Sequence, residues 1–171
     1  MTWRGRILLV LGGAALTHLV AIWALPRIIV RVVQRRLAAQ VGMNHIRHAP
    51  LPDAEWRSIV MPSPDLLYSA CAYDVSDRPV LITAELPDGY WSVSAFAENT
   101  DNFFVQNDRT ASNQRARVVF SSQPHFQDPG GGTVVQVPSK TGIILFRQLV
   151  LDRTDLPKAQ AIQRAATCAP L

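Results

Sequence analysis

The densest group of oxygen-bearing side chains in the sequence lies around residue 100. Asn99, Asp101 and Asn102 occur within four positions, and further Asn and Asp residues follow up to position 108. Oxygens crowded in this way can ligate calcium, which takes about six to eight of them, although the spacing is not that of an EF-hand loop. Asn and Asp also favour turns, because their side chains bond nearby backbone N–H groups. The segment is therefore either a ligand-binding loop or a polar turn between two strands.

An acid, a phenol and a guanidinium form a second candidate group. Asp65 and Tyr68 are three residues apart, and Arg147 lies in a later apolar segment. Together they could line a pocket and hold a small polar ligand. In the alternative interpretation Asp65 caps a turn, Tyr68 packs in the core with its hydroxyl satisfied, and Arg147 pairs with a carboxylate. Both interpretations stay open at this point.

The histidines and glycines match no familiar catalytic pattern. His45 and His48 have an i, i+3 spacing that suits zinc, but the sequence offers no second pair of ligands beside them. The triple glycine at 130–132 lacks the Lys-Ser/Thr of a phosphate loop, so we interpret it as a hairpin turn. A triad of Ser, His and Asp from distant positions stays open, because geometry and not order defines a triad. We predict no metal ion and no cofactor.

The two cysteines are far apart in the chain. Cys71 lies in a strand-like segment and Cys168 near the C-terminus. In an oxidising compartment they could form a disulfide, closing a loop of about 100 residues and contributing roughly 4–5 kcal/mol in the chain-entropy treatment. Two buried, unpaired thiols are the alternative, because sequence spacing does not establish proximity.

The elements that must position these residues are mostly strands. Apolar alternation and turn residues predict seven of them, over residues 66–75, 79–86, 90–97, 103–106, 115–121, 133–137 and 142–151. The short turns between the first three indicate an antiparallel meander. One helix is predicted after Asp155, because Pro157 fits its first turn and apolar residues recur at helical spacing up to Ala166. The predicted soluble fold is an all-β sandwich or barrel with one C-terminal helix.

An apolar N-terminal run decides where this domain works. Residues 7–25 carry no charge, and as a helix they would be about 28 Å long, close to the ~30 Å hydrocarbon thickness of a bilayer. A cleaved signal peptide is the alternative, but its apolar region has about 7–15 residues and ends at small residues, whereas this run ends at Leu25-Pro26-Arg27. Residues 26–36 carry four arginines at helical spacing, which predicts an amphipathic extension at the lipid headgroups. We therefore predict a retained single-pass anchor.

The anchor also carries a strip of small residues. Gly13, Thr17 and Ala21 recur every four positions, and His18 lies beside them. Small and polar residues on one face of a membrane helix favour pairing with another helix. A monomeric helix with chance small residues is the alternative.

Charge separates the anchor from the rest of the chain. Six of the seventeen basic residues and none of the thirteen acidic ones fall in residues 1–36, so residues 37–171 have a formal charge of −2. A nucleic-acid surface would need a basic patch on the folded domain, so we exclude that partner class. We divide the chain into an anchor at 1–36, a linker at 37–59 and a β-rich domain at 60–171.

Short motifs in the soluble part occur in a familiar order: Pro64-Asp65-Leu66-Leu67-Tyr68-Ser69, Asp74, Pro79, Gly89-Tyr90 and Asn102-Phe103. Together with the final strand and closing helix, they resemble the bacterial domain-of-unknown-function family 1254 over residues 60–171. Leu67 departs from the threonine common in that family, and Trp91 also departs from its pattern. Larger members join this domain to a second β-domain, of family 1214. The resemblance therefore implies a partner, a second membrane-anchored protein that carries the companion domain.

Two classes of function follow from these observations. The first is a non-enzymatic binding or assembly module that docks the companion domain. The second is an envelope hydrolase or other enzyme whose active site is completed by that partner. In both, the protein contacts membrane lipid through its anchor. The arginines on the two sides of the apolar run are too evenly divided to set its orientation. We expect an inner-membrane protein with a periplasmic domain.

Overall fold

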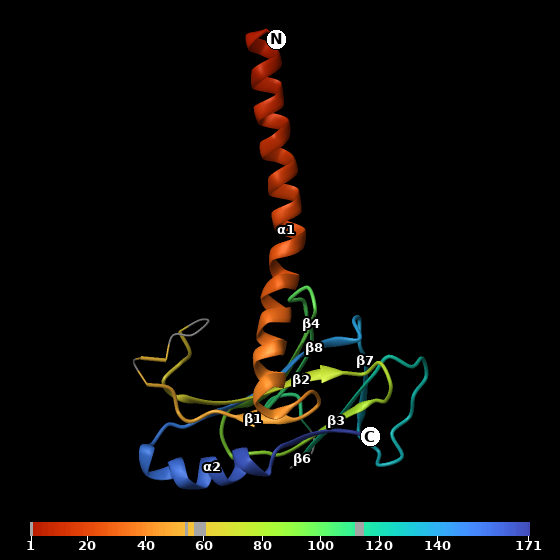
Figure 1. The fold of residues 1–171 in the computed structure, drawn as a ribbon. Coiled ribbons are helices and arrows are strands. Elements are labelled where there is room, and N and C mark those ends of the chain that lie inside the picture. Colours follow the sequence, from red (N-terminus) through yellow and green to blue (C-terminus); the bar gives the residue numbers. More distant parts are fainter. Residues whose placement is uncertain (1, 54, 57–60, 112–114) are drawn as a thin grey trace.

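The longest element is the 39-residue helix α1 (Trp3–Val41), whose N-terminal part projects from the rest of the molecule (Figure 1). The computed structural model describes residues 2–171 except 54, 57–60 and 112–114. Thr2 caps the helix by accepting a hydrogen bond from Gly5 N at 3.3 Å. Gly42 ends it with a φ of 89°, a conformation that favours glycine. Pro26 lies inside α1, so the apolar run and its arginine-rich extension form one helix.

Nine strands among the described residues after α1 form two packed sheets. The strands are β1 (Ile46–His48), β2 (Leu66–Asp74), β3 (Val80–Glu85), β4 (Trp91–Ala97), β5 (Asn102–Asn107), β6 (Arg115–Ser121), β7 (Thr133–Gln136), β8 (Thr141–Leu149) and β9 (Thr167–Pro170). Sheet A has the order β1-β2-β8-β4-β5, and sheet B has the order β7-β6-β3-β9. Neighbouring strands are antiparallel except β6 and β7. All seven predicted strands are present, and β1 and β9 were not predicted.

The predicted meander of the first three strands is wrong. β2 pairs with β1 and β8, whereas β3 pairs with β6 and β9 in the other sheet. The chain then returns to sheet A with β4, which pairs with β5 and β8. The short turns reverse the chain as expected, but each one crosses from one sheet to the other. Turn residues signal a reversal without indicating which sheet the next strand joins.

The core lies between the two sheets and is rich in aromatic residues. Tyr73 of β2 and Phe120 of β6 stack with ring centroids 6.2 Å apart. Phe103 and Phe104 of β5 meet the ring of Phe120 edge-on, at 6.2 and 5.6 Å. Because each such aromatic pair contributes about 0.5–1.5 kcal/mol beyond its burial, this group helps to hold sheet A against sheet B.

A second helix closes one end of the sandwich. The 3-10 turn η1 (Arg153–Asp155) leads into α2 (Leu156–Ala165), which lies at the end of the domain opposite to the N-terminal part of α1 (Figure 1). Gln163 of α2 donates hydrogen bonds from Nε2 to the carbonyls of Ala49 and Tyr68, at 3.0 and 2.9 Å. The domain is therefore a β-sandwich with a closing helix. With α1 included, the class is not all-β, because a 39-residue helix joins the nine strands.

The triple glycine is not a hairpin turn, since it leads into β7, which runs parallel to β6. Asp128 organises this loop by accepting hydrogen bonds from the backbone of Gly130 and Gly132, at 3.1 and 2.8 Å. Arg117 of β6 donates to the same carboxylate from Nε at 2.7 Å and from Nη2 at 2.9 Å. Its side chain lies so close to Gly130 and Gly132 that a Cβ at either position would clash with it. Packing against Arg117 therefore explains why glycine occupies positions 130 and 132.

Candidate functional site

Strand register brings two of the predicted site residues together on the outer face of sheet A. Tyr68 of β2 lies directly opposite Arg147 of β8, and Ser92 of β4 lies opposite Arg147 on the other side. The guanidinium donates from Nε to Ser92 Oγ at 3.1 Å and from Nη2 to Ser94 Oγ at 3.0 Å. The predicted carboxylate partner is therefore replaced by two serine hydroxyls, which the sequence analysis missed. Alternation along β4 places both serines on one face and could have revealed them.

The third member of that group lies apart from it. Asp65 is exposed, and its carbonyl accepts a hydrogen bond from Val150 N at 2.8 Å. Tyr68 Oη accepts a hydrogen bond from Ser63 N at 3.0 Å. Within the described residues, no ion pair joins Asp65 or any other acid to Arg147. The guanidinium therefore keeps a charge that an incoming carboxylate or phosphate could pair with.

The oxygen-rich segment forms the turn between β4 and β5. Asn99 donates from Nδ2 to Asp101 Oδ2 at 2.6 Å and accepts from Asp101 N at 3.2 Å. Thr100 between them has a φ of 75°, and Asn102 is exposed at the start of β5. The side chains of Asn99 and Asp101 thus bond within the turn. No cluster of three or more His, Cys, Asp or Glu side chains suited to a metal occurs in the described part of the chain.

His48 bonds a serine and not a second histidine. Its Nδ1 lies 2.9 Å from Ser69 Oγ, across the β1–β2 pair. Burial lowers the pKa of His48 below its usual value of 6.5, and the charge of Arg164 lowers it further. The pair has the separation of a nucleophile and its base, but Ser69 is only 1% exposed. His45 is exposed, with Nδ1 2.8 Å from the carbonyl of Met43. The two histidines therefore do not share a site.

The cysteines connect the two sheets. Cys71 of β2 in sheet A and Cys168 of β9 in sheet B form a disulfide with their Cα atoms 6.5 Å apart. Both are buried, at 1% and 4% exposure. The bond ties the C-terminal strand, which ends the chain after α2, to the centre of the core.

The anchor's small-residue face is free of the domain. Gly13, Thr17 and His18 are exposed on α1, and Ala21 is half-buried. A Cβ added at Gly13 would meet nothing within 4 Å. Helix pairing through this face stays a prediction.

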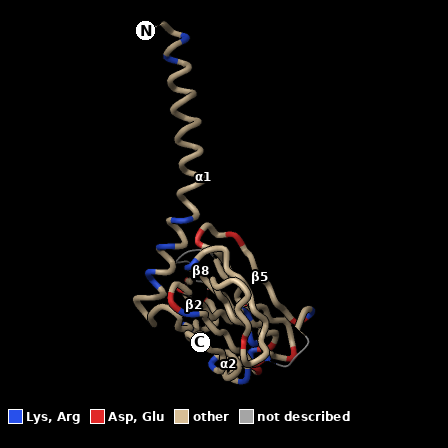
Figure 2. The backbone as a smooth tube through the Cα atoms, turned by 90° about the vertical axis from the view of Figure 1, so that its right-hand side faces the viewer, with Lys and Arg blue, Asp and Glu red and all other residues tan. Residues whose placement is uncertain are grey.

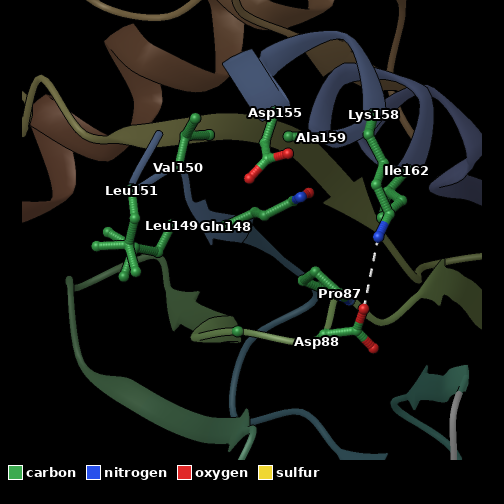
Figure 3. Close-up of a pocket in the computed structure, with 11 residues that line it drawn as sticks. Pro87, Asp88, Gln148, Leu149, Val150, Leu151, Asp155, Lys158, Ala159 and Ile162 are labelled. Carbon is green, nitrogen blue, oxygen red and sulfur yellow. Dashed lines mark ion pairs between the residues drawn. The ribbon is translucent and has the colours of Figure 1, made fainter. Parts of the chain in front are cut away.

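A hollow of about 230 Å³ lies under α2, at the far end of the domain from the apolar part of α1 (Figures 1 and 3). Its lining comes from the β3–β4 loop, the end of β8 and one face of α2. Gln148 of β8 is 2% exposed, and its Oε1 has no hydrogen-bond partner. Lys158 Nζ lies 3.5 Å from Asp88 Oδ2 across one side. The sequence analysis missed this site, because its residues come from three separated segments.

A two-sheet sandwich carried on a helix long and apolar enough to cross a membrane defines the class of this protein. The chain belongs to the family described as "Protein of unknown function (DUF1254)", whose sequence model matches residues 43–170. The match confirms the resemblance stated above and includes β1, which lies in the segment expected to be a linker. A comparison with curated proteins gave no match.

Two solved structures share the fold. The VPA0106 protein from Vibrio parahaemolyticus is 17% identical, with a TM-score of 0.69 over 88% of this chain. A putative uncharacterized protein from Burkholderia cenocepacia is 15% identical, with a TM-score of 0.54 over 87% of this chain. The chain spans only 36% and 40% of those two proteins. At these identities the similarity shows the fold alone, and the two proteins contain much further chain.

Proposed function

We propose that this protein is a single-pass membrane protein whose β-sandwich is a non-enzymatic binding or assembly module. Its partner would be a second membrane-anchored protein carrying a family-1214-type companion domain. The observation that carries the proposal is the outer face of sheet A, where Arg147 has a charge but no acidic partner among the described residues. A docked domain could supply that acid.

The way α1 meets the domain supports an anchoring role. Val30 and Leu37 are buried against the sandwich, and Gln34 donates from Nε2 to the carbonyl of Gly142 at 2.9 Å. The residues of 7–25 are almost all exposed, as expected for a segment that packs against lipid. Figure 2 shows Lys and Arg but no acid along α1, with the acidic residues on the domain. The helix would thus hold the domain directly beneath the headgroups, with its arginines at their level.

Part of sheet A's outer face is open to a partner. α1 packs near the β1 edge, over β1, β2 and the start of β8, whereas β5 is the opposite edge strand. Toward the β5 edge, Val105 is 49% exposed and Tyr90 is 39% exposed. Val105 lies opposite Ser94, so it shares the face of Arg147. An exposed apolar side chain beside an uncompensated guanidinium is the composition of many protein interfaces.

The lengths of the two similar proteins also support a separate companion domain. Because the chain spans 36% and 40% of them, the same fold there belongs to a longer polypeptide. A separate protein with the companion domain would complete the corresponding assembly here. The disulfide supports a periplasmic location for the domain in the inner membrane, because disulfides persist in oxidising compartments. The Ser69–His48 pair gives the enzyme alternative no support, because Ser69 is buried.

The test is co-purification of the detergent-extracted full chain with its membrane neighbours, analysed by mass spectrometry. We expect a protein carrying the companion domain. Val105→Glu should abolish its recovery, because a charge would be placed in the proposed interface. Val134→Glu is the matched control, since Val134 is a 37% exposed valine on the edge strand β7 of the other sheet. Failure to recover the companion, or equal recovery with Val105→Glu, would contradict the proposal.

A further inference from the structure

The hollow under α2 contains a buried acceptor that nothing in the described protein satisfies. Gln148 points from the inner face of β8 into this space, and its Oε1 has no partner (Figure 3). With 2% exposure the side chain is almost completely withdrawn from solvent. Buried side-chain oxygens without a donor are rare and unfavourable in folded proteins. A ligand that brings an N–H or O–H donor would remove this penalty.

The charges around the hollow select the kind of donor. Asp155 makes no side-chain capping bond to α2, and its carboxylate is turned toward Gln148 in Figure 3. The charge of Lys158 is offset by Asp88 across one side. The balance of charged groups in the lining is therefore one negative charge. A cationic donor fits this site better than a neutral or anionic one.

The remaining lining is apolar. Leu149, Val150 and Ile162 line the hollow beside the polar groups, and Leu151 at its edge is 89% exposed. Ligand sites commonly combine apolar walls with a few convergent polar groups. The wall here suits a short hydrocarbon stem joined to the donor group.

We propose that this hollow binds a small organic cation, an amine or guanidinium whose N–H groups reach Gln148 Oε1 and the Asp155 carboxylate. Its stem would lie against Leu149 and Ile162. Helix α2, which forms one wall of the hollow, lies at the end of the domain away from the apolar part of α1 (Figure 1), so the ligand would enter from the aqueous side. The proposal does not depend on the docking of a companion domain.

The test titrates the full chain in detergent micelles with three probes that have unbranched alkyl stems of three or four carbons: n-butylguanidinium, n-butanol and butyrate. Binding is followed by the ¹⁵N resonances of the Gln148 side-chain amide and the backbone of α2. We expect saturable shifts with butylguanidinium. Butanol should bind at least about tenfold more weakly, and butyrate should not bind. Preferential binding of butyrate or butanol, or no saturable shift with butylguanidinium, would overturn the proposal.

Three variants locate the site. Gln148→Leu should weaken butylguanidinium binding about tenfold because it removes an acceptor, and Asp155→Asn about threefold because it removes the negative charge. Ile162→Trp should abolish binding by filling the hollow while leaving both acceptors in place. Gln127→Leu, at an exposed loop position, is the matched control and should bind as the wild type does. Unchanged affinity in Ile162→Trp would overturn the proposal even if Gln148→Leu failed to fold.

Discussion

Single residues stabilise this domain mainly by satisfying buried polar groups. The side chains of Gln34, Gln163 and Asp128 form hydrogen bonds to backbone groups, which for the two glutamines lie in segments distant in sequence. The side chain of Asp128 is 0% exposed, and the hydrogen bonds from Arg117 hold the pKa of its carboxyl well below the usual value of 3.8. The backbone N–H groups of Gly130 and Gly132 lower that pKa further. The ionised carboxylate is therefore part of the fold.

Asp128→Asn should destabilise the domain and change its response to acid. Because the folded pKa lies below the unfolded one, the stabilisation is fully present above pH 4 or so and is lost as the pH falls toward the folded pKa. We expect the Tm at pH 7 to fall by about 5 °C or more, and the difference from wild type to shrink on acidification. Thermal unfolding between pH 7 and pH 3 measures it. Asp77→Asn, at an exposed turn position, is the control. A pH-independent difference would contradict the mechanism.

Substitution of Arg147 also distinguishes a binding module from an enzyme. Arg147→Lys keeps the charge but loses the forked donation to Ser92 and Ser94. A binding module should tolerate this change, and Asp65→Asn, with only altered affinity for its partner. An enzyme should lose turnover. Affinity of the companion-domain protein for each variant, measured by interferometry in detergent, is the readout. Unaltered affinity in Arg147→Lys would remove Arg147 from the proposed interface.

At the scale of elements, α1 combines two roles along one axis. Its C-terminal part packs on sheet A through Val30, Gln34 and Leu37. Its N-terminal part is free of the domain, and Trp3 and Trp23 are exposed near the two ends of the apolar run. Aromatic residues at this spacing, about 30 Å along a helix, suit the two interfaces of a bilayer. Arg27 lies over the ring of Trp23 at 4.6 Å and extends the interfacial contact.

Replacing Gly13 and Thr17 by leucine should abolish self-association or partner association of α1, if its small-residue face pairs helices. Bulky side chains would keep the two backbones apart. A membrane reporter assay of the isolated segment and of the full chain measures the association. Leu8→Ile and Leu19→Ile, which alter neither charge nor the small-residue face, serve as the control pair. Unchanged association in the double leucine variant would refute helix pairing.

At the scale of the whole molecule, the disulfide joins the two sheets. It spans 97 positions, from β2 to β9. The chain-entropy treatment assigns a crosslink of this length about 4–5 kcal/mol. Reduction should therefore loosen β9, because β9 is a four-residue edge strand that this disulfide ties to β2.

Cys168→Ser should lower the free energy of unfolding of the detergent-extracted protein by about 4 kcal/mol. Chemical unfolding of wild type with and without a thiol reductant, compared with Cys168→Ser, gives the measurement. The reductant should destabilise wild type and leave the variant unchanged. The redox state of Cys71 and Cys168 in the native membrane is a separate measurement that tests the location, since reduced thiols there would contradict a periplasmic domain.

Sequence periodicity by itself determined the longer local elements of this protein. The apolar residues show which face of a segment avoids water in the charge-free run 7–25, in the alternating segments 66–75 and 142–151, and in the helix after Asp155. Helix and strand spacing follow directly from that pattern. Motif order was also sufficient to indicate the family over most of the soluble chain.

Only the tertiary structure decided which segments meet. Periodicity shows that a face is buried but not what it is buried against, so it could not show that β2 and β3 enter different sheets. The same limit hid the contact between Asp128 and Arg117 and the unsatisfied Gln148 under α2. Cys71 and Cys168 could be judged only as candidates, because a disulfide needs close Cα atoms and sequence distance does not report them.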